Sequence, residues 1–221
     1  MTQEQKGEPI MEWPDSWRDA FRIELRAQAI ALVCRGWPVM PGTYPNGSDW
    51  VGGAEIGRSG PRPVPERWLD HAQADPVETA EWWNEDTYSL LVATGTVVDA
   101  IEVGDDVGRH AAAVLRRNGL RVPIAASPEG RWFFLTQPGR PLRAELAERE
   151  DVVLHTTGGW IPLPPTAFPH GVMHWRVRPE DCGWRLLAAD AVQYVVLRAT
   201  IEAAMESVAG QRFVDAERTV A

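Results

Sequence analysis

The sequence has little cysteine, no long apolar run and no excess of basic residues, and each shortage excludes a class of protein. The two cysteines, Cys34 and Cys182, lie far apart beside apolar or turn residues, which excludes a disulfide framework and a cysteine-ligated zinc site. No run approaches the roughly 20 apolar residues that a membrane-spanning helix needs, and residues 1–9 are too polar for a secretion signal. We therefore expect a cytoplasmic protein that does not bind membranes.

The shortage of basic charge lowers the expectation of tight, non-specific DNA binding. The chain has 22 Lys and Arg against 31 Asp and Glu, which gives a net charge of −9 at pH 7. Domains that bind nucleic acid generally carry a basic excess that neutralises phosphates. A local basic surface on an acidic protein can still attract an anion. A nucleotide, a nucleic acid and a protein all remain open as partners.

What the sequence does contain is an ordinary globular composition with many tryptophans. Hydrophobic residues make up 44% of the 221 residues, enough for a substantial core. The 11 tryptophans are spread from Trp13 to Trp184 and suit core and groove positions, or base stacking for some of them. We predict a flexible arm at residues 1–14, one domain over residues 15–209 and a C-terminal tail at residues 210–221.

The order of periodic segments and breakers predicts an α+β fold with a mixed or antiparallel central sheet flanked by helices. Asp75-Pro76 has the sequence of a capped helix start, and Gly95 separates two β-rich runs. Residues 43–65 lack a sustained period and predict a long loop. Further strands are predicted at 124–126, 131–136 and 152–156, and further helices at 16–35, 108–118 and 187–209.

Several landmarks along the chain occur in an order typical of one family. They are Arg35-Gly36-Trp37-Pro38 after the first helix, Asp75-Pro76 before Trp82-Trp83, Thr94-Gly95 before Asp99, and the glycine- and proline-rich run 158–166. Over residues 20–200 this order resembles the PrimPol (bifunctional DNA primase/polymerase) branch of the archaeo-eukaryotic primases. The resemblance implies a primase-polymerase-like fold and a metal-dependent nucleotidyltransferase, with Mg²⁺ or Mn²⁺ as the cofactor, in DNA replication or repair.

The resemblance assigns catalytic and metal-binding roles to Asp99 and Glu102. In that family two carboxylates lie two positions apart on a strand, so both face one pair of metal ions. Here the two acids are three positions apart, so a regular strand places them on opposite faces unless a bulge intervenes. Asp106 is a further metal candidate, although Asp105 and Asp106 equally suit a polar turn before a helix.

The other two family motifs also differ from the expected pattern. The second motif has a histidine that faces the nucleotide phosphates, and Trp132 stands in its place here, next to Arg131, which can contact a phosphate. The third acid is missing before the glycine pair, where His155 is the remaining ligand candidate. Gly158 and Gly159 permit positive φ and close backbone approach, so we predict a turn or bulge at this pair. We predict that Arg131, His155, Gly158 and Gly159 bind a nucleotide.

Two of the three catalytic motifs therefore lack their family residue, and the first keeps its two acids at a changed spacing. Three hypotheses follow, which leave enzymatic activity open. The first is a degenerate PrimPol-like domain that retains nucleotide or nucleic-acid binding without catalysis. The second is an active primase/polymerase that uses Asp99, Glu102 and Asp106. The third is a protein-interaction module, which suits the acidic charge and the many tryptophans and predicts a large exposed aromatic patch.

Overall fold

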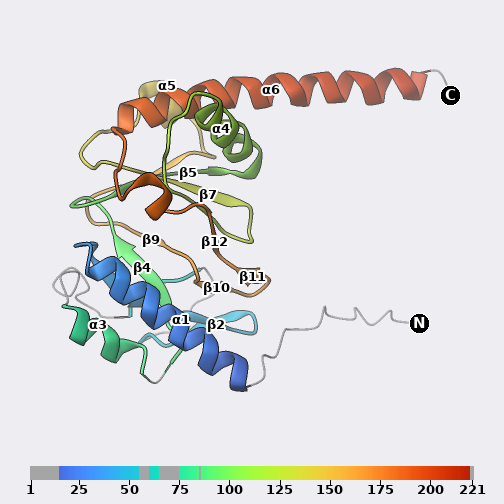
Figure 1. Cartoon of the computed structure of the whole chain (residues 1–221). Helices are drawn as coiled ribbons and strands as arrows, with labels where there is room; N and C mark the ends of the chain where they lie inside the picture. The colour runs from blue at the N-terminus through green and yellow to red at the C-terminus, as the bar shows by residue number, and fades with distance from the viewer. Residues whose placement is uncertain (1–14, 55–59, 65–74, 85, 220–221) are drawn as a thin grey trace, which may run out of the picture. The chain divides into compact units, whose positions relative to one another are not determined.

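The structure, a computed structural model, describes residues 15–54, 60–64, 75–84 and 86–219 (Figure 1). The predicted arm at residues 1–14 lies outside these residues. In the described part of the chain, no helix is both long and apolar enough to cross a membrane.

The chain divides into two compact units, and each is assembled from two separate stretches. The first unit contains Met1–Val92 and Pro162–Met173, and the second contains Ala93–Ile161 and His174–Ala221. Along the sequence, the chain thus passes from the first unit to the second, back to the first at residues 162–173, and then to the second again. The predicted single domain over residues 15–209 stays a prediction.

The first unit combines helices with short antiparallel strand pairs. Its elements are α1 (Asp15–Val33), β1 (Val39–Gly42), β2 (Tyr44–Asn46), β3 (Asp49–Val51), α3 (Pro76–Trp82), β4 (Ser89–Ala93, whose last residue belongs to the second unit), β10 (Ala167–Phe168) and β11 (Gly171–Val172). The pairs are β1 with β4, β2 with β3, and β10 with β11. Helix α3 begins as predicted, because the Asp75 carboxylate accepts hydrogen bonds from the backbone N–H groups of Val77 and Glu78, each at 2.8 Å.

The second unit is built on a five-stranded antiparallel sheet. Its strands are β5 (Asp99–Gly104), β6 (Ile124–Ala126), β7 (Arg131–Thr136), β8 (Val153–His155) and β12 (His174–Val177), in the order β12-β6-β7-β5-β8. Its helices are α4 (Asp105–Arg117), α5 (Ala144–Ala147), the 3₁₀ helix η1 (Glu180–Cys182) and α6 (Ala189–Thr219). Strand β9 (Trp160–Pro162) lies at the boundary between the units. An antiparallel sheet with flanking helices confirms the predicted α+β class.

Helices α4 and α6 pack their apolar faces against one face of this sheet. The shared core includes Ile101 and Phe134 of the sheet, Val114 of α4, and Val192 and Val196 of α6, all at most 2% exposed. Strands place alternate residues on opposite faces, so every second residue of β5 faces these helices. Helix α6 continues to Thr219, past the boundary predicted at residue 209.

Candidate functional site

Strand β5 carries both predicted catalytic acids, and its pairing shows how they are oriented. Six consecutive residue pairs join β5 to β7, from Asp99 opposite Thr136 to Gly104 opposite Arg131. This register is continuous, so the strand alternates regularly. Asp99 and Glu102 therefore lie on opposite faces of the sheet, and the structure does not bring them together.

Asp99 is fully buried on the face that α4 and α6 cover. Its Oδ2 atom accepts hydrogen bonds from the backbone N–H of Gly139 at 3.0 Å and from the hydroxyl of Thr156 at 3.2 Å. Its Oδ1 atom has no hydrogen-bond partner among the described residues, and neither does Oγ1 of Thr136 across the ladder. Through these two hydrogen bonds, Asp99 connects the start of β5 to the segments that follow β7 and β8.

Glu102 lies on the other face, where it meets two of the predicted nucleotide-binding residues. Its Oε1 atom accepts a hydrogen bond from Nε of Arg131 at 2.5 Å, and its Oε2 atom lies 2.6 Å from Nε2 of His155. A carboxylate can only accept, so the histidine nitrogen donates. We call Glu102, Arg131 and His155 the Glu102 cluster. All three side chains are partly buried.

The register of three neighbouring strands explains why the cluster forms. Arg131 pairs with Gly104, and His155 pairs with Ala100, so both flank Glu102 at a distance of two residues along β5. Residues two apart on a strand face the same side. Arg131 also donates from Nη2 to the backbone carbonyl of Asp151 at 3.3 Å, which holds the guanidinium in place.

The cluster keeps the Glu102 carboxylate ionised. Burial alone would raise the pKa of Glu102, but hydrogen bonds from His155 and Arg131 outweigh it, and the charges of the two residues add to their effect. The pKa of Glu102 is therefore lowered. Both carboxylate oxygens are already engaged by donors from this chain.

Trp132, which stands at the histidine position of the family motif, lies on the face of the sheet opposite Glu102. It faces α4, where a Cβ added to Gly108 would lie 2.5 Å from the indole ring. The guanidinium of Arg176 lies 5.0 Å from the ring centroid, within range of a cation–π interaction. Because neighbouring strand residues alternate, it is Arg131, and not Trp132, that shares a face with Glu102.

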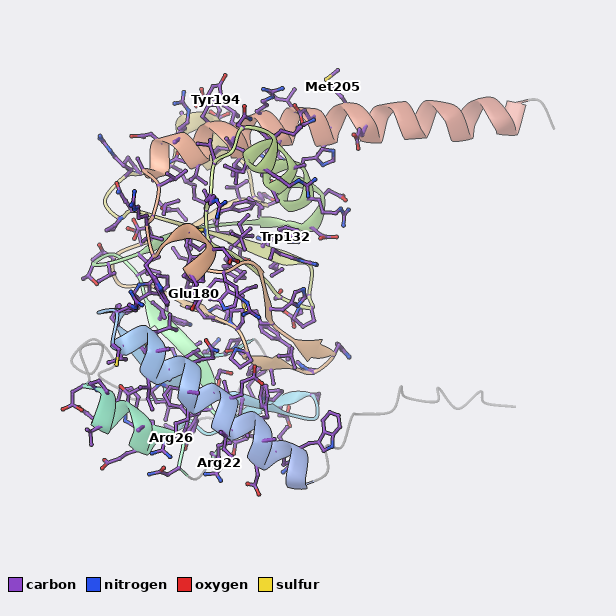
Figure 2. All side chains as sticks on the ribbon, in the orientation of Figure 1. Arg22, Arg26, Trp132, Glu180, Tyr194 and Met205 are labelled. Atoms are coloured by element: carbon purple, nitrogen blue, oxygen red, sulfur yellow. The ribbon has the colours of Figure 1, made fainter. Side chains whose placement is uncertain are left out.

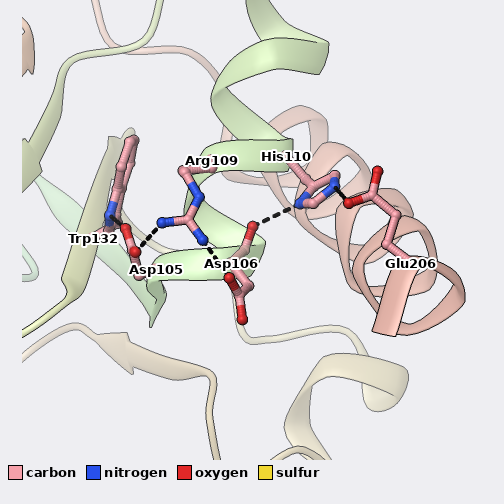
Figure 3. Close-up of polar contacts among 6 residues, drawn as sticks. All are labelled: Asp105, Asp106, Arg109, His110, Trp132 and Glu206. Atoms are coloured by element: carbon pink, nitrogen blue, oxygen red, sulfur yellow. Dashed lines mark hydrogen bonds and ion pairs between the residues drawn. The ribbon is translucent and has the colours of Figure 1, made fainter. Parts of the chain in front are cut away.

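Asp106 lies in the first turn of α4, where Figure 3 shows its contacts with Arg109 and His110. Its side chain is 80% exposed and forms an ion pair with Arg109, which also pairs with Asp105. Asp105 in turn accepts a hydrogen bond from the indole N–H of Trp132 at 2.7 Å. The predicted polar turn before the helix is thus wrong in position, because α4 already begins at Asp105 and Gly104 is its cap. Both aspartates lie in the first helical turn, where acidic side chains are favourable.

Figure 3 also shows a contact between α4 and α6 that includes a histidine. His110 Nδ1 lies 2.8 Å from the carbonyl oxygen of Asp106, and Nε2 lies 3.1 Å from the carboxylate of Glu206. The backbone hydrogen bond to Asp106 and then the Glu206 carboxylate raise the pKa of His110. A raised folded-state pKa means that the protonated form is stabilised by folding.

We expect His110 to make stability depend on pH in a defined direction. Its contribution is complete below the ordinary histidine pKa of about 6.5 and disappears as pH rises through the higher folded-state pKa. Replacing it by His110→Gln should therefore cost about 0.5 kcal/mol at pH 5.5 and little at pH 9, measured by urea unfolding. Glu206→Gln, which removes only the acidic partner, should reduce the same difference. A loss that is equal at both pH values would contradict this assignment.

The predicted glycine pair forms a turn. The backbone N–H of Gly159 donates to the carbonyl of Thr156 at 2.8 Å, and Gly158 has a φ of +83°. Thr94 anchors the turn, because its backbone N–H donates to the carbonyl of Gly159 at 3.0 Å and its hydroxyl donates to the carbonyl of Thr156 at 2.7 Å.

Sequence patterns did not single out the two residues that hydrogen-bond to Asp99. These residues are Thr156 and Gly139, and each contacts Asp99 across a long stretch of chain.

The residues present do not fit a two-metal carboxylate site. Such a site needs several carboxylate or histidine ligands that converge on the ions. Within the described residues, no three His, Cys, Asp or Glu side chains are grouped so that they could hold a metal ion. Asp99 points to the opposite face, and both oxygens of Glu102 are hydrogen-bonded to Arg131 and His155.

The fold and the cluster define an α+β protein that gathers an acid, an arginine and a histidine on adjacent strands of one antiparallel sheet. Residues 29–188 match the Prim-Pol family, described as bifunctional DNA primase/polymerase, N-terminal. The match covers most of the chain, so this protein belongs to the Prim-Pol family, as its motifs predicted. The family acts on nucleotides and DNA and is generally metal-dependent. A search of the curated proteins finds no match.

Proposed function

We propose that this protein is a catalytically degenerate Prim-Pol domain that retains nucleotide or nucleic-acid binding, in a cytoplasmic role related to DNA replication or repair. The observation that carries the proposal is the Glu102 cluster. Both oxygens of Glu102 are bound by Arg131 and His155, while Asp99 is buried on the opposite face.

Loss of catalysis follows from the number of acids on the face of the cluster. Two-metal phosphoryl transfer needs acids that hold both ions and so stabilise the attacking and the leaving oxygen. Ala100 lies two positions before Glu102, so it shares the face of Glu102 and occupies the place where the family has a second acid. His155 pairs with Ala100 across the ladder and donates to Glu102. On this face β5 therefore carries one acid, Glu102, which is paired with Arg131 and His155.

Retained binding follows from the donors that the same face presents. Arg131 is always charged and presents several N–H groups in a planar fork that suits phosphate oxygens. His155 adds a second donor, and a phosphate would compete with Glu102 for both side chains. In the turn after β8, Gly158 has a φ of +83° and no neighbouring atom within 4 Å of an added Cβ, so a ligand could closely approach the backbone there.

We expect no template-dependent nucleotide incorporation with Mg²⁺ or Mn²⁺, together with dATP binding that persists in EDTA. Primer-extension gels test the first part, and isothermal titration tests the second. Arg131→Gln should weaken dATP binding at least about 10-fold, because a charge-assisted hydrogen bond to phosphate is lost. Glu102→Gln should strengthen it, because a competing negative charge is removed.

Arg149→Gln is the matched control, since Arg149 forms a partly exposed ion pair with Asp151 near the cluster. It should leave dATP affinity within about 2-fold of the original, as an exposed pair contributes little. Metal-dependent incorporation that is lost in Asp99→Ala would overturn the degenerate assignment in favour of an active primase/polymerase. Equal affinities of the Arg131→Gln and Arg149→Gln variants would contradict the binding role. An interaction module stays the third alternative, with a large exposed aromatic patch as its distinguishing feature.

A further inference from the structure

Helix α6 has a second apolar stripe, on the side away from the core. Tyr194, Ile201 and Met205 are 63%, 56% and 68% exposed. Figure 2 shows Tyr194 and Met205 on the side of α6 that faces away from α4. At 100° per residue, positions 194, 201 and 205 fall within a narrow sector, because their spacings of seven and four residues each approximate whole helical turns.

The core side of the same helix is already occupied. Val192, Val195, Val196 and Ala199 are buried in the core shared with α4 and the sheet. Glu206 and Glu202 reach His110 and Arg117 of α4 along one flank. The stripe is therefore additional to what the fold of this unit requires. Large apolar side chains that line up on an exposed helix face are typical of a surface that binds another helix.

We propose that the stripe pairs two copies of this chain through antiparallel α6 helices, related by a two-fold axis near Thr200. The inference does not depend on nucleotide binding. In this arrangement each Tyr194 lies at the level of Met205 of the partner subunit, and the two copies of Ile201 meet near the axis. A two-fold contact requires such a self-complementary surface, because the same patch serves both subunits.

The charges beside the stripe favour the same arrangement. Arg198 and Glu202 lie on one flank of the stripe, joined by a 2.9 Å ion pair within the helix. They are placed symmetrically about position 200. An antiparallel pair centred there puts Arg198 opposite Glu202 of the partner subunit, and Glu202 opposite the partner's Arg198. Opposite charges across an interface fix its register more than its strength.

The length of α6 is sufficient for such a contact. At about 1.5 Å per residue, the 31 residues of α6 span roughly 46 Å. Figure 1 shows that α6 continues past the end of α4.

Sedimentation-velocity measurements from 1 to about 100 μM test the proposal on the full chain. We expect the full chain to sediment as a dimer, with Ile201→Glu raising the dimer dissociation constant at least about 100-fold, because a symmetric contact loses two buried side chains and gains two like charges. Ile23→Glu is the matched control: Ile23 lies on α1 and is 65% exposed, and its replacement should leave the dissociation constant unchanged. Both variants should keep the melting temperature within a few degrees, because both positions are exposed.

A charge exchange then tests the antiparallel register. Chains carrying Arg198→Glu have two acids on the flank, and chains carrying Glu202→Arg have two arginines. Each alone should dimerise more weakly than the original chain, and an equimolar mixture should recover dimerisation as a heterodimer. A chain that is monomeric throughout the concentration range would overturn the proposal, as would a dimer that Ile201→Glu and Ile23→Glu affect equally. A mixture that recovers nothing would overturn the antiparallel geometry.

Discussion

Gly95→Ala is expected to destabilise the protein by about 3 kcal/mol, because both backbone conformation and packing exclude a side chain there. Gly95 has a φ of +102°, and a Cβ atom would lie 2.3 Å from the Cα atom of Thr157. The obstacle is backbone of the turn that Thr94 anchors, so no side-chain rotation can relieve it. Relief would require moving the turn and its hydrogen bonds to Thr94.

Urea unfolding followed by circular dichroism measures this loss, with Gly119→Ala as the matched control. Gly119 has a φ of +66°, and an added Cβ would meet no atom within 4 Å. Its replacement should therefore cost only the conformational penalty of about 1 kcal/mol. Similar losses for the two variants would show that the close approach to Thr157 contributes nothing.

Asp99→Ala is expected to lower the free energy of unfolding by about 2 kcal/mol in EDTA, where no metal can contribute. The change removes the acceptor of two hydrogen bonds, one from the backbone N–H of Gly139, an exposed residue, and one from the hydroxyl of Thr156, a partly buried residue. Asp99→Asn keeps an acceptor oxygen, so it should cost less than the alanine variant. Chemical denaturation with and without EDTA measures both variants.

The two roles considered for Asp99 give opposite results in that experiment. A structural acid affects stability regardless of metal, whereas a metal ligand affects it mainly when Mg²⁺ or Mn²⁺ stabilises the folded state. Unchanged stability of Asp99→Ala in EDTA, combined with lost Mn²⁺ binding, would contradict the structural role described here.

Local sequence signals predicted the elements that depend on neighbouring residues. The Asp75-Pro76 helix start, the break at Gly95 and the glycine turn at residues 158–159 were all predicted, since capping and positive φ are set within a few residues. The pairing of β2 with β3 was missed within a predicted loop. Asn46-Gly47, with Gly47 at a φ of +64°, was the available signal of a hairpin.

The candidate site was predicted only in part, because its geometry depends on which strands become neighbours. The three-residue spacing of Asp99 and Glu102 correctly predicted opposite faces for a regular strand. That Glu102 meets Arg131 and His155 required the register of β5 with β7 and β8, which pairs residues distant in sequence. Aligning the family motif by sequence placed Trp132 at the histidine position, whereas the strand period places Arg131, and not Trp132, on the face of Glu102.

The interleaving of the two units also determines when each can be completed during synthesis. When residue 92 has been synthesised, the ribosome has produced only part of the first unit. The rest of that unit follows with residues 162–173. The second unit needs α6 for its core, so it finishes later still. Neither unit can fold to completion as an N-terminal fragment, which delays co-translational folding until most of the chain exists.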